Sequence, residues 1–191
     1  MRRNVWVCSI LVLATSLLAC AEKFVTFPES KELPSPDGKF VVRNFDRGAQ
    51  ASSEIVGAFH ALVLEERATG KTRRLLNYVR RVAVAWAPGN LLIVTDYVSK
   101  RSARAIIFAA DNSFDPIVID KVALERAVPE ALRFHLMEND HVYIEASRLD
   151  GKNLIFRVWG YGPREPGGFR FLCGFNLDQS TVSCRETGPQ P

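Results

Sequence analysis

The sequence predicts a mainly β protein, built as an antiparallel meander with one short helix. Short runs rich in β-branched and aromatic residues recur along the chain, and such runs are typical of strands. Turn signals built on Pro, Gly, Asn and Asp separate these runs at short intervals. One stretch before Pro129 carries a helix start signal instead. The chain has 191 residues, 47% of them hydrophobic, which is enough for one domain with a substantial core.

Residues 1–19 predict an export signal. Arg2 and Arg3 supply a positive start, and a mostly apolar run of about fifteen residues follows over 5–19. A cationic start, an apolar run and an exit of small residues are the three parts of a secretory signal. The run is shorter than the roughly twenty apolar residues that cross a bilayer core.

The exit from this signal, Leu17-Leu18-Ala19-Cys20, resembles the lipobox of bacterial lipoproteins. In that family the cysteine is acylated, with palmitate among its acyl chains, and becomes the new N-terminus. The resemblance therefore implies a lipid anchor at Cys20, although Leu18 is bulkier than the small residue usual at its position. Neither Ala21 nor Glu22 is the Asp that retains such proteins at the inner membrane, which implies the outer membrane.

An alternative exit is Ala19-Cys20-Ala21, which matches the A-x-A site of ordinary signal cleavage. Cleavage there releases a soluble periplasmic or secreted protein.

With either exit Arg2 and Arg3 are removed, which lowers the Lys and Arg count from 25 to 23 against 21 acids. The remaining net charge of about +2 points to no particular partner.

Residues 20–34 are polar with scattered apolar side chains, as expected of a tether between a lipid anchor and a domain. As an alternative, Phe24, Val25 and Phe27 add an edge strand. We expect the β domain itself over residues 35–187, followed by a tail at 188–191.

A turn followed by a strand occurs twice, about fifty residues apart. Ser35-Pro36-Asp37-Gly38-Lys39 leads into 40–45, and Trp86-Ala87-Pro88-Gly89-Asn90 leads into 91–96, with strands over 60–66 and 72–76 between them. This order resembles the repeat of TolB-like β-propellers, in which a W-S-P-D-G-K turn opens each four-stranded blade. The resemblance covers about residues 35–110 and implies propeller-blade-like sheets. A generic β-meander is the alternative.

A third unit is expected in the C-terminal part, with strands over 133–137, 142–146, 154–159, 169–177 and 181–184. A closed propeller usually needs at least four blades. Three units therefore predict an open or incomplete propeller, or a sandwich. The helix is placed over 121–127, where Asp120 caps its start. Pro129 either ends it or starts a second turn at 130–132.

No catalytic motif is present in the sequence. A nucleophile elbow, a phosphate-binding loop, a zinc-binding H-E-x-x-H helix and a C-x-x-C pair are all absent. We therefore expect no enzyme activity, no cofactor and no metal site.

Cations are concentrated in one part of the chain. Residues 67–104 contain nine Lys and Arg residues and a single acid. Arg73, Arg74, Arg80 and Arg81 are candidates for a basic face that attracts anionic lipid, anionic glycan or an acidic protein. In the alternative, alternation along strands divides these arginines between two faces and acids elsewhere neutralise them.

Residues 159–169 are predicted to form a long Gly/Pro loop. Trp159, Tyr161 and Arg164 are its candidate binding residues, because aromatic and Arg side chains in loops are frequent binding hot spots. In the alternative, this segment only connects two strands, and Trp159 and Phe169 belong to the core.

Outside the signal and its exit, two cysteines remain, Cys173 and Cys184. An oxidising periplasm allows them to pair. A hairpin with its turn between Asp178 and Gln179 places the two cysteines directly opposite each other. We expect a disulfide between them, and two free, buried thiols are the alternative.

Together these features predict an exported envelope lipoprotein that faces the periplasm and has a non-catalytic binding or scaffold domain. The expected partners are the membrane, through the lipid anchor, and an envelope protein or an anionic lipid or glycan. Nucleic acid is not expected as a partner of an exported protein. The alternative is a small periplasmic hydrolase or ligand-binding protein whose site is assembled from distant loops.

Overall fold

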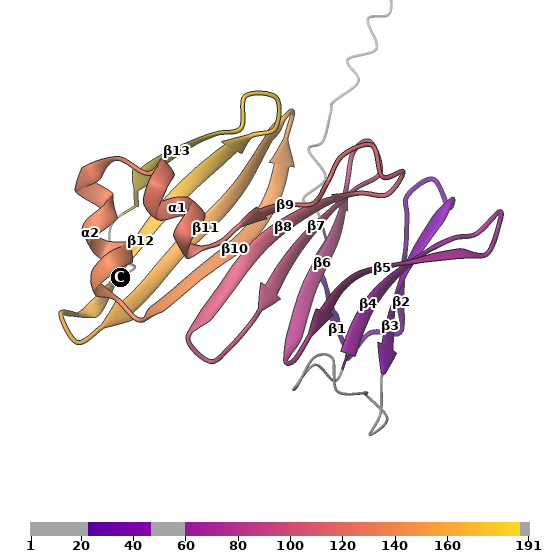
Figure 1. Ribbon diagram of the computed structural model, residues 1–191, viewed down its shortest axis with the longest axis horizontal. Coiled ribbons are helices and arrows are strands. Elements are labelled where there is room, and N and C mark those ends of the chain that lie inside the picture. The colour runs from indigo at the N-terminus through magenta and orange to yellow at the C-terminus, as the bar shows by residue number, and fades with distance from the viewer. Residues whose placement is uncertain (1–22, 47–59, 188–191) are drawn as a thin grey trace, which may run out of the picture.

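The computed structural model describes residues 23–46 and 60–187, which form two β-sheets and two helices (Figure 1). The helices are α1 (Lys121–Ala127) and α2 (Glu130–Glu138). The strands are β1 (Val25–Phe27), β2 (Glu32–Pro34), β3 (Phe40–Asp46), β4 (His60–Glu66), β5 (Lys71–Tyr78), β6 (Arg81–Ala87), β7 (Leu91–Tyr97), β8 (Ser102–Ala109), β9 (Ile117–Ile119), β10 (His141–Asp150), β11 (Asn153–Gly162), β12 (Glu165–Asn176) and β13 (Thr181–Glu186).

The strands divide into a larger and a smaller sheet. The larger has the order β1-β6-β7-β8-β10-β11-β12-β13, with β9 also paired to β8, and the smaller has the order β2-β3-β4-β5. Among the described strands only β8 and β10 pair in parallel, and they do so over two residue pairs, Ser102 with Val142 and Ala103 with Tyr143. The prediction of a mainly antiparallel β protein is confirmed, and the described sheets do not close into a barrel.

One hydrophobic core lies where the smaller sheet packs on β1 and β6–β8. Its large members include Phe27, Leu62, Tyr78 and Trp86, all buried. The Trp86 indole N–H donates to the Leu33 carbonyl at 3.2 Å, which joins the two sheets by a polar contact as well.

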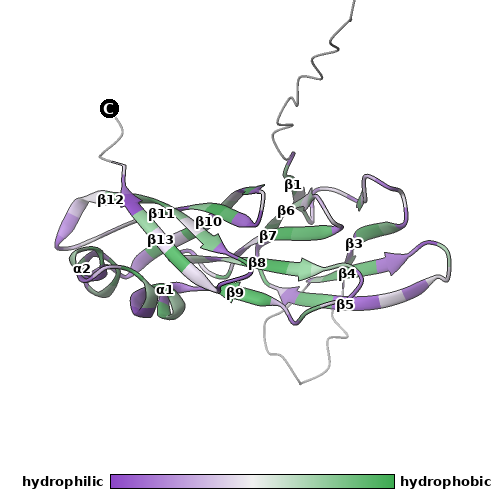
Figure 2. Cartoon of the chain, turned by 90° about the horizontal axis from the view of Figure 1, so that it is seen from above, coloured by the Kyte–Doolittle hydropathy of each residue, from purple (hydrophilic) through white to green (hydrophobic). Residues whose placement is uncertain are grey.

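The second core lies under the helices. Leu124 of α1 and Leu136 of α2 are fully buried in one cluster with Val158 and Phe171, and Figure 2 shows both helices on one side of the C-terminal strands. Because successive side chains of a strand point to opposite faces, the residues next to Val158 and Phe171 face away from the helices. Helix packing thus leaves the other face of β10–β13 uncovered by α1 and α2.

The described residues form two helices, α1 and α2, whereas the sequence predicted one. The α1 prediction is confirmed, with the Asp120 carboxylate accepting from the Ala123 N–H at 2.8 Å. The strand predicted over 133–137 is wrong, because these residues lie in α2. Leu132 and Leu136, one helical turn apart, face the core, while Phe134 and Met137 are exposed. A short apolar run fits a strand and a helix equally well, and here contact with the core decides for the helix.

The predicted long loop at 159–169 is also wrong, because most of it is hairpin. Strand β11 runs on to Gly162 and β12 begins at Glu165. A Cβ at Gly160 would lie 2.8 Å from the Phe169 ring and closer still to the His141 carbonyl. Glycine here permits close approach inside a sheet, which the sequence pattern alone does not distinguish from a loop.

The predicted disulfide is confirmed. Cys173 of β12 and Cys184 of β13 are register partners, and their sulfur atoms are bonded.

At the other end of the chain, β1 pairs with β6, so the edge-strand alternative holds for Val25–Phe27. Cys20 and the predicted export signal lie outside the described residues. No helix among the residues described is long and apolar enough to cross a membrane.

Candidate binding face

Aromatic and basic side chains gather on the face of β10–β12 that the helices leave uncovered and on the adjoining ends of β6 and β7. We call this surface the aromatic–basic face. On β10–β12 strand alternation creates it, because the apolar neighbours of its residues there lie in the core. Its members are Arg80, Arg81, Tyr97, Lys100, Tyr143, Glu145, Arg157, Trp159, Tyr161 and Arg170.

A stacked aromatic pair lies at the centre of the aromatic–basic face. Tyr143 of β10 and Trp159 of β11 are direct cross-strand partners, and their ring centroids are 4.1 Å apart with an interplanar angle of 17°. The Tyr143 hydroxyl donates to the Lys100 carbonyl, which ties the β7–β8 turn to the pair. Burial, as the largest cause, raises the pKa of Tyr143, so the phenol stays protonated and can keep this contact.

A second aromatic centre lies next to this pair, on β7. Cζ of Arg81 lies 4.3 Å from the centroid of the Tyr97 ring, a cation–π arrangement. The Tyr97 hydroxyl donates to Glu145 at 3.0 Å. Burial and then the Glu145 charge raise the pKa of Tyr97, while Arg81 opposes the shift. Tyr97 is therefore neutral at physiological pH and is held in place by one charge of each sign.

Positive charge exceeds negative charge on this face. Glu145 is its single acid, and it pairs with Arg157 at 3.5 Å and accepts from Tyr97. Arg80, Lys100 and Arg170 are exposed and have no acidic partner within the part of the chain that the structure describes. These three cations are available to an anionic ligand.

Three shallow hollows run along the aromatic–basic face and meet at Trp159. The first, of about 300 Å³, lies between Arg80, Lys100 and Trp159, and the second, of about 450 Å³, lies between Trp159, Arg157 and Arg170. The third, of about 240 Å³, continues from Trp159 and Arg170 to the turn at Gly167. Each is open to solvent, so together they form a groove along the sheet face.

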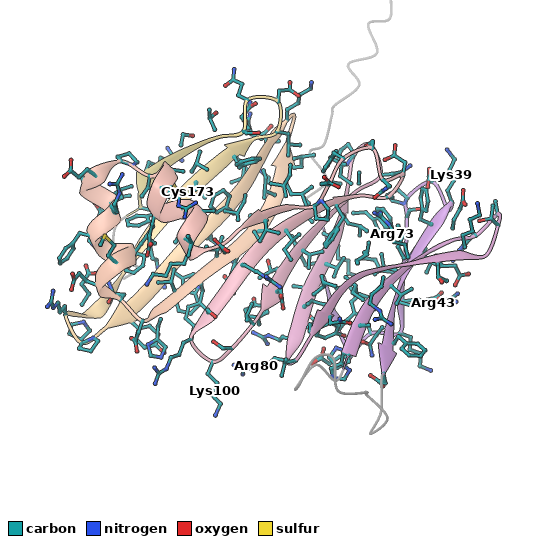
Figure 3. All side chains as sticks on the ribbon, in the orientation of Figure 1. Lys39, Arg43, Arg73, Arg80, Lys100 and Cys173 are labelled. Atoms are coloured by element: carbon teal, nitrogen blue, oxygen red, sulfur yellow. A yellow bond between two sulfur atoms is a disulfide. The ribbon has the colours of Figure 1, made fainter. Side chains whose placement is uncertain are left out.

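The four predicted arginines of the basic stretch do not share one surface. Arg80 and Arg81 belong to the aromatic–basic face, whereas Arg73 and Arg74 lie on β5 of the smaller sheet. The Arg73 guanidinium donates to the Ala109 carbonyl at 2.6 Å and to Asn112 at 2.5 Å, so its role is to join β5 to the chain after β8. Figure 3 shows Arg73 far from Arg80 and Lys100, which lie near each other.

The three candidates from the predicted loop have different positions. Trp159 is at the centre of the groove. Tyr161, two residues further along β11, lies on the same face, is 41% exposed and stacks on His141 with a centroid distance of 4.3 Å. Arg164 lies at the hairpin turn and pairs with Glu138 of α2, so it contacts the helices.

Several members of the face were not selected from the sequence. Tyr143, Glu145, Arg157 and Arg170 each lie between buried apolar residues in a strand, and Tyr97 follows the buried Asp96. The alternation of apolar with aromatic or charged residues around Tyr143 and Trp159 was the available signal. Which of these side chains lie side by side depends on the register that pairs one strand with the next. The sequence pattern does not specify that register.

The histidines make carboxylate contacts of a structural kind. His60 lies 2.6 Å from Asp46, His135 lies 2.6 Å from Glu165, and His141 lies 2.9 Å from Asp140. Within residues 23–46 and 60–187 no three His, Cys, Asp or Glu side chains are grouped so that they could hold a metal ion.

Comparison of the chain with protein-family models, with curated proteins and with solved structures finds no match. The functional argument below therefore depends on the aromatic–basic face.

Proposed function

We propose that this protein is an exported envelope lipoprotein, anchored through Cys20 in the outer membrane, whose β domain binds another envelope component without catalysis. The aromatic–basic face is the observation that supports binding. Preformed aromatic side chains flanked by cations lose little conformational freedom when a ligand binds, which favours affinity. The alternative of a hydrolase has no comparable support. The three hollows at this face are open to solvent, and Glu145 is the one carboxylate that lines them. Ser99 lines the first hollow, and no histidine or thiol lines any of the three.

We further propose that the sheets are blade-like, as the resemblance to propeller repeats implies. Two features support this. The smaller sheet is a four-stranded unit in the order β2-β3-β4-β5. The turn at Ser35 and Asp37 lies next to the corresponding turn at Asn90, whose side chain donates to Asp37 at 3.0 Å. Open sheets of this kind leave sheet faces available for partners.

Site-specific crosslinking in cells tests the binding proposal. A photoreactive phenylalanine analogue replaces Tyr161, which is exposed on the aromatic–basic face. The matched control replaces Val122, which is 52% exposed on α1, on the other side of the sheet. We expect a crosslinked adduct from position 161 and none from position 122.

Three outcomes would contradict the proposal. Equal labelling from both positions would mean nonspecific contact, and no adduct from position 161 would mean an unoccupied face. An adduct with twice the mass of the chain would mean that the face binds a second copy instead of another component.

A further inference from the structure

We infer that the ligand of the aromatic–basic face is a linear polysaccharide that carries carboxylate or phosphate groups. This inference rests on the proposed binding function and adds the chemical class of the ligand. Three properties of the face support it: the extended shape of the groove, the aromatic surface at its centre and the distribution of charge.

The shape of the groove fits a chain. The first two hollows share Glu145 and Trp159, and the second and third share Trp159 and Arg170. A single small ligand would occupy one hollow. A polymer can follow all three, from the ends of β6 and β7 to the β11–β12 turn, and contact Trp159 midway.

The centre of the groove fits a sugar ring. Stacking on Tyr143 fixes the Trp159 indole without hiding it, since Trp159 lines all three hollows. An aromatic face carries negative charge density, and the C–H bonds on one face of a pyranose ring present positive density to it. Sugar rings therefore stack on such platforms, while their hydroxyl groups point sideways toward hydrogen-bonding partners.

The charge of the groove fits an anionic chain. Arg80 and Lys100 line its first hollow, and Arg157 and Arg170 line its second. The guanidinium group donates two parallel hydrogen bonds to carboxylate or phosphate, and such charge-assisted contacts are the stronger ones. Anionic groups spaced along a polymer can contact cations on both sides of Trp159 at once.

An added peptide strand fits this face less well. Strands β11 and β12 have a neighbour on each side, so their backbone N–H and C=O groups are already paired. Addition of a strand needs an open sheet edge. A lipid bilayer is the other anionic surface to test, because Val79 and Val98 are exposed next to Arg80 and Lys100.

Direct binding to defined polymers tests the inference on the full chain with Cys20→Ser, which carries no acyl chain, needs no detergent and can reach vesicles only through its β domain. The probes are polygalacturonate, which carries carboxylates, and phosphomannan, which carries phosphates. Dextran is the neutral control, polyglutamate is the anionic control without sugar rings, and phosphatidylglycerol vesicles represent a membrane. We expect binding to at least one anionic polysaccharide, weaker binding to polyglutamate and none to dextran. Affinity should fall as salt rises.

Variants separate the charge from the aromatic surface. Arg80→Ser with Arg81→Ser should weaken polysaccharide binding about tenfold, as expected for loss of charge-assisted contacts. The matched double variant Lys71→Ser with Arg126→Ser removes the same charge from exposed positions elsewhere and should leave affinity unchanged. Trp159→Leu should weaken binding by a similar factor, and Trp159→Phe should restore most of it. A thermal melt of each variant checks that it folds.

Equal affinity for polyglutamate, or no effect of Trp159→Leu in a folded variant, would overturn the inference, because plain charge would then explain binding. Binding to phosphatidylglycerol vesicles and to none of the polysaccharides would assign the face to a membrane and also overturn it. If no polysaccharide binds but the adduct at position 161 forms, the inference fails and the proposed function stands. If that adduct is absent as well, both fail.

Discussion

Asp37 shows how a single carboxylate organises a turn. It accepts hydrogen bonds from the Ser35 hydroxyl at 2.7 Å, from the Lys39 backbone N–H at 3.0 Å and from Asn90 at 3.0 Å. These donors, with Ser35 first, hold the pKa of Asp37 well below its ordinary value of 3.8. Folding therefore favours the ionised form. This stabilisation is present above pH 3.8 and is lost as the pH falls toward the lower pKa of the folded state.

We expect Asp37→Asn to lower the free energy of unfolding at pH 7 and to make stability less sensitive to acid. Urea denaturation from pH 7 down to about pH 3 measures both effects, since this range covers the titration of carboxylates. Asp115→Asn is the control, because Asp115 is an exposed carboxylate elsewhere on the surface. A variant with the same acid dependence as the wild-type protein would show that the Asp37 contacts do not stabilise the fold.

Gly160 gives a second prediction about single residues. An added Cβ would meet the His141 carbonyl and the Phe169 ring, both at distances shorter than van der Waals contact. Gly160→Ala should therefore lower the free energy of unfolding by about 1–3 kcal/mol, the usual cost of overpacking. Gly167→Ala is the matched control in the same hairpin, because an added Cβ there meets nothing within 4 Å. Urea midpoints compare the two, and equal stabilities would refute the predicted clash.

Among the structural elements, the β12–β13 hairpin is closed by the Cys173–Cys184 bond, with the cysteines 11 residues apart. In the chain-entropy model a loop of this length is worth about 2–3 kcal/mol. We expect the double variant Cys173→Ser, Cys184→Ser to lose about this much stability in urea denaturation. Intact mass of the protein purified from cells without reductant should be two hydrogens below that of the reduced form. Two thiols that alkylate without prior reduction would contradict the pairing.

The same hairpin shows what the sequence could predict. The turn and the cysteine pairing follow from local alternation around Phe171 and Cys173, because a hairpin register is fixed by its own turn. The start of β12 at Glu165 was not predicted, since the residues before Phe169 were assigned to a loop. A second turn at 130–132 was one alternative for the start of α2, but 133–137 was predicted as a strand because this short apolar run fits either period. The pairing of Tyr143 with Ala103 joins distant parts of the chain through a parallel contact with no turn to reveal it. The aromatic–basic face depends on that contact, so it could not be assembled from the sequence.

For the whole molecule, the proposed location in the envelope depends on Cys20. If this cysteine is acylated, Cys20→Ser should move the protein from the membrane fraction to the soluble periplasm, or stall its processing. A single acyl chain binds only marginally and several chains hold firmly, so the loss should be nearly complete. Cell fractionation followed by immunoblotting measures it. Wild-type protein recovered in soluble form and starting at Glu22 would favour ordinary signal cleavage.

The narrow contact between β8 and β10 has a consequence for the order of folding. Most other strand pairs of the larger sheet join neighbours in the chain, whereas the Tyr143 hydroxyl and the Lys100 carbonyl are 43 residues apart. Closing that long loop costs chain entropy before its contacts repay it, so we expect this junction to form after the hairpins on either side. Because Tyr143 and Lys100 also line the groove, recovery of binding during refolding should lag behind formation of the hairpins on either side, and the groove would report that the two parts of the larger sheet have joined.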